Sequence, residues 1–187
     1  PALRVMLDDD AYGLSRRRVT VSTSGLVRQI DKLAAQCPVA LAVSLHAPND
    51  DLRNEIVPVN RQIGLEEILA AADRYFEASG RRLTFEYVLL GRLNDEPRHA
   101  KQLARLLRGR TALLNVIPYN PVAGLPYHTP TLDAQQLFRE ILEREGVNVH
   151  FRVRKGDQID AACGQLRRST PDLVTPELVN LDAPRQQ

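Results

Sequence analysis

Hydrophobic and β-branched residues gather in five short runs along the chain. The runs occupy residues 18–22, 39–45, 83–90, 112–117 and 147–153, and residues 39–43 are apolar without interruption. A short continuous apolar run is typical of a strand in a parallel sheet whose two faces are both covered. The pattern therefore predicts five strands, with the second strand buried on both sides.

Between these runs, apolar residues recur at intervals of three and four, which is the period of an amphipathic helix. The first helical segment covers residues 26–35. The other three are carried by Leu65, Ile68, Leu69, Ala72 and Phe76, by Ala100, Leu103, Leu106 and Leu107, and by Leu137, Ile141 and Leu142. Gly80, Gly109 and Gly146 follow these three segments, at positions where a left-handed residue ends a helix.

The alternation of strands and helices predicts βαβ units and therefore a parallel sheet in an α/β fold. No strand is followed by the Gly-x-Gly-x-x-Gly turn of a dinucleotide-binding fold. We expect a partial parallel (βα) barrel of about five strands, because a standard barrel needs eight strands to close. We assign it to residues 1–168 and expect an irregular tail at residues 169–187, which contain three prolines.

Composition limits the domain size, the partners and the cellular compartment that we expect for this chain. The chain has 187 residues, of which 43% are hydrophobic, and this is enough for one domain with a core. A net charge of +2 is compatible with nucleic acid as a partner but does not indicate it. Two cysteines give no disulfide framework, so we expect a reducing cytoplasm, and no apolar run is long enough to imply a membrane partner. Because the chain opens at Pro1 with a helical apolar pattern, we expect it to be a fragment.

Polar residues stand at the carboxyl ends of four of the predicted strands, which is where ligands of parallel βα folds bind. These residues are Ser22, Thr23 and Ser24, then Ser44, His46, Asn49 and Asp50, then Tyr119 and Asn120, then Arg152, Arg154, Lys155 and Asp157. Each also has a plainer interpretation. Ser22 or Ser24 would cap the helix at 26–35, Asn49 and Asp50 would cap the next one, His46 would be a hydrogen-bonded loop histidine, and Asn120 would form a turn.

Cys163 follows the last predicted strand, between small residues and near several arginines. Positive neighbours favour a nucleophilic thiolate, whereas a buried cysteine would only pack, and the sequence leaves both interpretations open. Cys37, directly before a proline, is interpreted as a packing residue. The histidines and cysteines show no ligand spacing, so we predict no metal site in this chain.

Five ordered motifs resemble the RlmN/Cfr family of radical S-adenosylmethionine RNA (adenine) methyltransferases, and resemble its RlmN branch more closely. They are VSTSG at 21–25, LAVSLHAPND at 41–50, EIVPVN at 55–60, IPYNP at 117–121 and GDQIDAACGQL at 156–166. The resemblance implies an incomplete (βα)6 barrel that binds S-adenosylmethionine across its strand ends. The matching contact positions are Ser22, Ser44, Leu45, His46 and Asn120, and Cys163 matches the cysteine that is itself methylated.

The resemblance also implies substrates and partners. It implies adenine C2 of 23S rRNA, and in some bacteria of tRNA, as the target, a [4Fe-4S] cluster, and an electron donor such as flavodoxin. The Cys-x3-Cys-x2-Cys motif and the resolving cysteine of the family are missing here, so we expect the fragment to be inactive and the cluster to belong to the parent protein only. Its first strand should leave an exposed edge that invites self-association. Two alternatives remain: methylation at adenine C8, and a cluster-free module that only binds RNA or a nucleotide.

Overall fold

The computed structural model describes residues 2–122 and 124–152, and the structural statements below concern these residues. Helices and strands alternate along the chain as the sequence predicts. The elements are α1 (Ala2–Leu7), β1 (Thr20–Thr23), α2 (Val27–Gln36), β2 (Ala40–Ser44), α3 (Asp50–Ile56), the 3-10 helix η1 (Pro58–Arg61), α4 (Leu65–Ser79), β3 (Leu83–Leu89), α5 (Pro97–Leu107), β4 (Leu113–Pro118), α6 (Leu132–Arg144) and β5 (Val149–Phe151).

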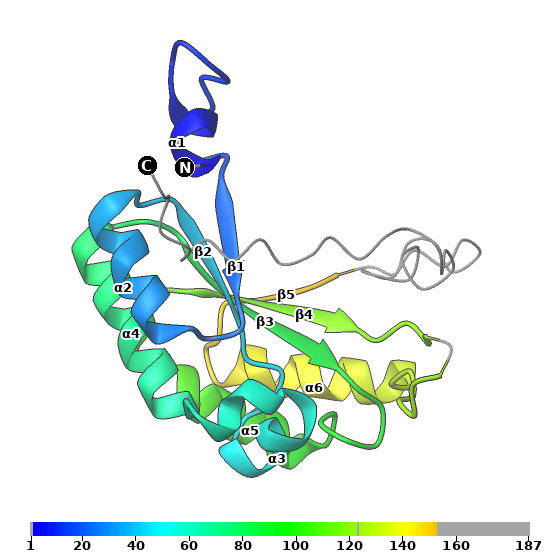
Figure 1. Ribbon diagram of the computed structural model, residues 1–187. Coiled ribbons are helices and arrows are strands. Elements are labelled where there is room, and N and C mark those ends of the chain that lie inside the picture. The colour runs from blue at the N-terminus through cyan, green and yellow to red at the C-terminus, as the bar shows by residue number, and fades with distance from the viewer. Residues whose placement is uncertain (1, 123, 153–187) are drawn as a thin grey trace, which may run out of the picture.

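The five strands form one parallel sheet in the order β1-β2-β3-β4-β5. Parallel βαβ crossovers are right-handed, so strands that follow one another in one direction place all their helices on the same side. Figure 1 shows α2, α4, α5 and α6 along one side of the sheet, and no described helix covers the other side. This arrangement is the predicted α/β fold, a curved parallel sheet with one helical layer.

Burial along the strands shows which face is covered. In β3 and β4, buried residues alternate with half-buried ones. The buried set includes Phe85, Tyr87 and Val116, which belong to the hydrophobic core beneath the helices. One face of β3 and β4 is therefore only half-buried in the described part of the chain. The prediction of burial on both sides concerned the second strand, and four of the five residues of β2 are buried.

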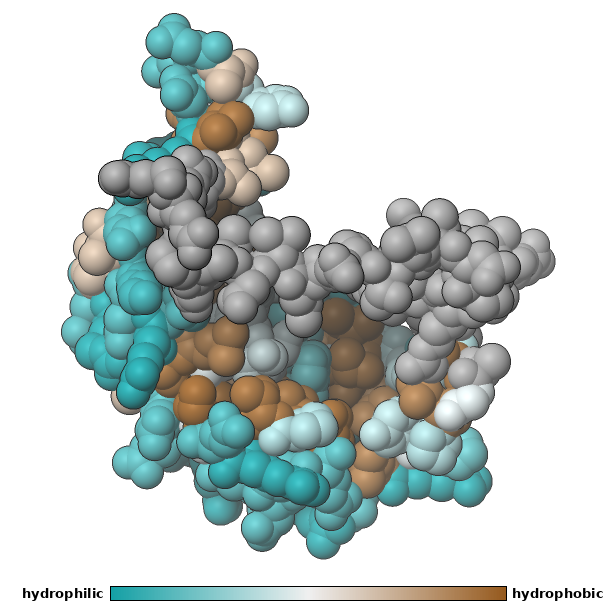
Figure 2. All heavy atoms as spheres, in the orientation of Figure 1, coloured by the Kyte–Doolittle hydropathy of each residue, from teal (hydrophilic) through white to brown (hydrophobic). Residues whose placement is uncertain are grey.

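In the described part of the chain, this second side of the sheet is accessible to a ligand. On this side Figure 2 shows brown, apolar side chains within teal, hydrophilic surroundings. The register assigns alternate residues of neighbouring strands to it, including Thr84 of β3 and Leu113 of β4. An apolar floor with polar residues among its side chains is typical of a small-molecule site.

Local features of the helices follow the sequence. α4 ends at Gly80, whose φ of 57° lies in the left-handed region that glycine adopts without steric cost, as predicted. The Thr131 side chain accepts a hydrogen bond from the backbone N–H of Ala134 and so caps α6. Within the described ranges, no helix has the length and apolar character needed to cross a bilayer.

Tyr75 connects the helical layer to the sheet. Its side chain is 1% exposed, and its hydroxyl donates to the backbone oxygen of Val39 at 2.7 Å and accepts from the backbone nitrogen of Val39 at 3.0 Å. Val39 directly precedes β2. The Tyr75 hydroxyl therefore pairs with both the backbone N–H and the backbone C=O of this buried residue.

Replacing Tyr75 by Phe should lower the free energy of unfolding by about 1–3 kcal/mol, because a buried donor and a buried acceptor lose their partner. Urea denaturation measures this change. Tyr12→Phe is the matched control, since Tyr12 is 72% exposed and its loss should be close to zero. Equal losses for the two variants would contradict the role given to Tyr75.

Candidate functional site

The two serines of the predicted site lie on the open face of the sheet. In the strand register, Ser22 of β1 stands opposite Ala42 of β2, and Ser44 stands two residues further along β2, so both serines face the same side. Ser22 is exposed and Ser44 is half-buried. Among the described residues, neither hydroxyl has a hydrogen-bond partner. Two polar groups are therefore available to a ligand at the carboxyl ends of adjacent strands.

His46 follows β2 with a left-handed φ of 61°. Its ring Nδ1 accepts a hydrogen bond from the backbone N–H of Val88 at 3.1 Å, and its backbone oxygen accepts from the Asn94 side chain at 2.8 Å. Nδ1 is therefore unprotonated, and the ring hydrogen lies on Nε2. Burial, and to a smaller extent the positive charge of Arg53, lowers the pKa of the imidazole to about 4. His46 is thus a neutral, hydrogen-bonded histidine at the strand end.

Arg53, which the sequence analysis missed, holds these strand ends together. Its side chain is fully buried, and its guanidinium donates to the backbone oxygens of Ser24 at 2.7 Å, Ser44 at 2.9 Å and Leu45 at 2.9 Å. A fourth hydrogen bond of 2.6 Å reaches Oδ1 of Asn60. One side chain therefore fixes the carboxyl ends of β1 and β2 relative to each other.

Asp50 and Asn60 complete the support around Arg53. Asn49 caps α3 as predicted, because its side chain accepts from the backbone N–H of Leu52. Asp50 does not act as the predicted cap of α3. Its Oδ1 instead accepts from the backbone N–H of Leu65, at the start of α4, and from the Asn60 amide. The negative charge of Asp50 also partly offsets the burial that lowers the pKa of Arg53.

The predicted serine cap of the first helix is wrong. Neither Ser22 nor Ser24 caps α2, which has no side-chain hydrogen bond at its N-cap residue Leu26. The intervening Thr23 takes this place in the turn, since its hydroxyl accepts from the backbone N–H groups of Gly25 at 3.1 Å and Leu26 at 3.3 Å. The side chain of Ser22 is therefore not used by the local turn.

Asn120 lies just beyond the end of β4, at the same edge. The backbone N–H of Tyr119 donates to the backbone oxygen of Leu89, so this segment continues beside the end of β3. Ser22, the segment from Ser44 through Leu45 to His46, and Asn120 are thus gathered along one edge. Cys163, Arg154, Lys155 and Asp157 lie outside the described residues, whereas Arg152 is described and is exposed directly after β5.

A row of polar side chains crosses the open face next to Ser44. Ser44 is in register with Glu86, Glu86 with Asn115, and Asn115 with His150. The Asn115 amide donates to Glu86 Oε2 at 2.8 Å, and its oxygen faces His150 Nδ1 at 3.3 Å. The sequence analysis did not single out this row. Polar residues in the middle of otherwise apolar strands were the signal that could have indicated it.

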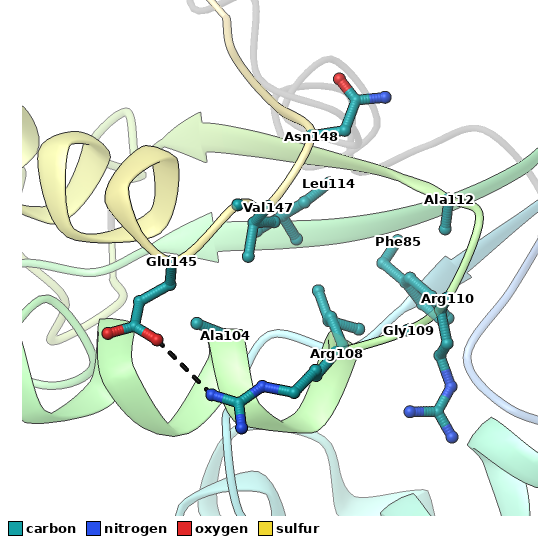
Figure 3. A pocket seen from close by; sticks show the side chains of 12 residues that line it. Phe85, Ala104, Arg108, Gly109, Arg110, Ala112, Leu114, Glu145, Val147 and Asn148 are labelled. Carbon is teal, nitrogen blue, oxygen red and sulfur yellow. Dashed lines mark ion pairs between the residues drawn. The ribbon is translucent and has the colours of Figure 1, made fainter.

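The opposite end of the sheet carries a different pocket. Figure 3 shows it between the loops that precede β4 and β5, with Arg108 and Glu145 joined by an ion pair of 3.6 Å. These loops lie at the amino ends of the strands, so this pocket is separate from the predicted site. In the described part of the chain no group of side chains could hold a metal ion, and Cys37 is buried, consistent with packing.

Comparison with known proteins identifies relatives of the chain, although no family model matches it. The curated probable dual-specificity RNA methyltransferase RlmN of Rhodopirellula baltica is 66% identical over 169 residues, which are 90% of this chain and 46% of that protein. A crystal structure of a radical SAM methyltransferase from Sphaerobacter thermophilus superposes with a TM-score of 0.83 at 46% identity. The chain belongs to the RlmN family.

The structural match covers 87% of this chain and 48% of the Sphaerobacter thermophilus structure, so the chain spans about half the length of these two relatives. A domain of a pyruvate-formate lyase-activating enzyme from Bacteroides vulgatus matches with a TM-score of 0.57 at 19% identity. That second likeness concerns the fold alone. The partial (βα) barrel predicted from the sequence is thus the architecture shared with a radical SAM methyltransferase.

Replacing Arg53 by Met should lower the free energy of unfolding by about 3–5 kcal/mol, because four buried or half-buried oxygens lose their donor. Urea denaturation measures the loss. Arg74→Met is the control, since Arg74 forms an exposed ion pair with Asp31 and should lose less than about 1 kcal/mol. If Arg53→Met does not fold, Arg53→Lys keeps the charge with fewer donors and should be less stable than both the wild type and the Arg74→Met control. An Arg53→Lys variant as stable as wild type contradicts the interpretation.

His46 should make the protein less stable as the pH falls from about 6.5 to about 4. In this range the unfolded histidine takes up a proton that the folded one excludes, so stability decreases with decreasing pH. Because burial also lowers the pKa of His99, the measurement is the difference from His46→Gln, which retains the His99 contribution. The stability advantage of wild type over this variant should shrink across the range. His150→Gln, at an exposed position, is the control and should keep the wild-type pH dependence of stability. A stability difference between wild type and His46→Gln that stays constant across this pH range would refute the assignment.

Proposed function

We propose that this chain provides the S-adenosylmethionine-binding edge of an RNA adenine methyltransferase acting at C2 of an adenine in 23S rRNA, and on tRNA adenine as well. The observation that carries the proposal is the gathering of Ser22, Ser44, His46 and Asn120 at one strand edge in a chain 66% identical to an RlmN protein. These are the positions at which the family resemblance implies contacts with the cofactor.

The residues at this edge suit a nucleoside with hydroxyl and amino groups. The hydroxyls of Ser22 and Ser44 have no partner in the described part of the chain and face an open side with apolar neighbours. Arg53 already satisfies the backbone oxygens behind them, so their positions are fixed before any ligand arrives. Such preorganisation favours binding, because little further ordering is needed.

Adenine C2 is not nucleophilic, so ordinary polar transfer of a methyl group does not suit it. S-adenosylmethionine, when bound, can supply both the methyl group and a radical that activates it. In this proposal the sulfur of Cys163 receives and holds the methyl group, while Ser22, Ser44 and Asn120 hold the nucleoside. The protein contributes by holding the thiol, the cofactor and the base in the correct positions relative to one another.

The residues of this chain do not fit an iron–sulfur cluster. Such clusters are held mainly by cysteine thiolates, and the family motif requires three cysteines, whereas the sequence contains only Cys37 and Cys163. We therefore propose that cluster ligands, and the contact with an electron donor such as flavodoxin, come from residues that are not in this chain. The chain alone is proposed to be inactive in methyl transfer.

Cys163→Ala tests the proposal when it is made in the full-length gene product that contains this chain. The variant should lose methyl transfer to RNA, while its iron content and its S-adenosylmethionine binding stay at wild-type levels. Mass mapping of rRNA and tRNA from cells carrying each form locates the methyl group at C2 or C8. Cys37→Ala is the control and should retain methylation, since Cys37 is a buried residue. Methylation that persists in Cys163→Ala would overturn the role of Cys163.

A further inference from the structure

Four arginines lie together at the end of the sheet opposite to the candidate site. Arg16 and Arg17 come before β1, and Arg81 and Arg82 come before β3, so both pairs lie at the amino ends of strands that flank β2. All four line one surface pocket with Ala40 and Gly80, which we call the four-arginine pocket. Because the two pairs are far apart in sequence, the fold creates this concentration of charge.

The charge in the four-arginine pocket is not neutralised by the described protein. The pocket has no carboxylate side chain in its lining, and none of its arginines takes part in an ion pair among the described residues. Other arginines do pair with acids, as Arg74 does with Asp31 and Arg98 with Glu96. The four-arginine pocket is therefore a site of uncompensated positive charge.

Arg81 shows a second sign of a missing partner. Its Nε is buried, yet no hydrogen-bond acceptor for it exists in the described part of the chain. Arg16, by comparison, reaches only the backbone oxygen of Pro38, at 3.4 Å. A buried donor without an acceptor is costly, so such a group points to an acceptor that the described chain does not provide.

We propose that the four-arginine pocket binds backbone phosphates of the RNA substrate, an inference that rests on the RNA substrate of the proposed function. Guanidinium groups bind phosphate through two parallel hydrogen bonds, which fits donors that lack acceptors. The two pairs precede strands that are two strand spacings apart, which is about 10 Å, so the pocket is wide enough for more than one phosphate. A polymer of regularly spaced phosphates fits this width better than a single small anion does.

The position of the pocket defines what it can do for the substrate. The five residues of β2 span about 16 Å between the two ends of the sheet, a distance that a folded RNA can bridge. Phosphate contacts fix the position of a nucleic acid without reading its bases. The pocket therefore positions RNA relative to the strand edge and does not choose the target adenine.

The test measures binding of a short fluorescently labelled RNA hairpin to the full 187-residue chain by anisotropy, over a series of salt concentrations. The variant is Arg17→Gln with Arg82→Gln, which changes two exposed arginines on the two sides of the pocket and avoids the half-buried Arg81. The variant should bind the RNA about tenfold more weakly at low salt. The negative slope of log affinity against log salt should become less steep by about one to two units. A hairpin of scrambled sequence should be affected equally.

Arg74→Gln with Arg98→Gln is the matched control, because it removes the same charge from exposed, ion-paired arginines. This control should keep the wild-type slope. Equal losses in both double variants, no binding by the wild-type chain, or equally tight binding of polyglutamate would each overturn the proposal. The outcome is separate from that of the methyltransferase itself, since Cys163→Ala tests methyl transfer and does not touch the four-arginine pocket.

Discussion

The guanidinium of Arg53 is the contact on which the candidate site depends. Parallel strands end with backbone oxygens that no further strand residue can satisfy, and here the oxygens of Ser24, Ser44 and Leu45 turn toward one buried point. A planar group with five donors suits this arrangement, whereas the ammonium of a lysine has three donors around one nitrogen. The charge is tolerated in the interior because its hydrogen-bonding capacity is largely used, with Asp50 nearby.

This constraint has consequences for the open face. Arg53 fixes the ends of β1 and β2 by binding their backbone oxygens. The side chains of Ser22 and Ser44 therefore need not support the backbone, and among the described residues they remain available on the open face of the sheet. Asn94 has a comparable role one strand further along, since its amide donates to the backbone oxygens of His46 and Val88. Arg53 and Asn94 thus support the strand ends, and the open side of the sheet carries the side chains that are proposed to contact the ligand.

How much of this could be read from the sequence depends on the range of each interaction. The period of apolar residues gave the strands and helices, and Asn49 and Gly80 were recognised because their effects act within a few residues. Arg53 was missed because its partners are backbone oxygens, one of them 29 residues away, and backbone atoms leave no trace in a sequence. The predicted serine cap of α2 was wrong for a related reason. Thr23 competes with Ser22 and Ser24 for the same turn, and the sequence alone does not show which of the three hydroxyls takes it.

The polar row beside Ser44 shows how hydrogen-bond chemistry fixes orientation across strands. Glu86 Oε2 accepts from the amide nitrogen of Asn115, so the amide oxygen of Asn115 faces His150. His150 in turn must donate from Nδ1, which leaves Nε2 with a lone pair when the ring is neutral. A single carboxylate on β3 therefore sets the hydrogen-bond direction as far as β5, the strand that precedes the segment containing Cys163. Because Ser44 and Glu86 are in register, the proposed nucleoside edge and this row form one continuous polar surface on the open face of the sheet.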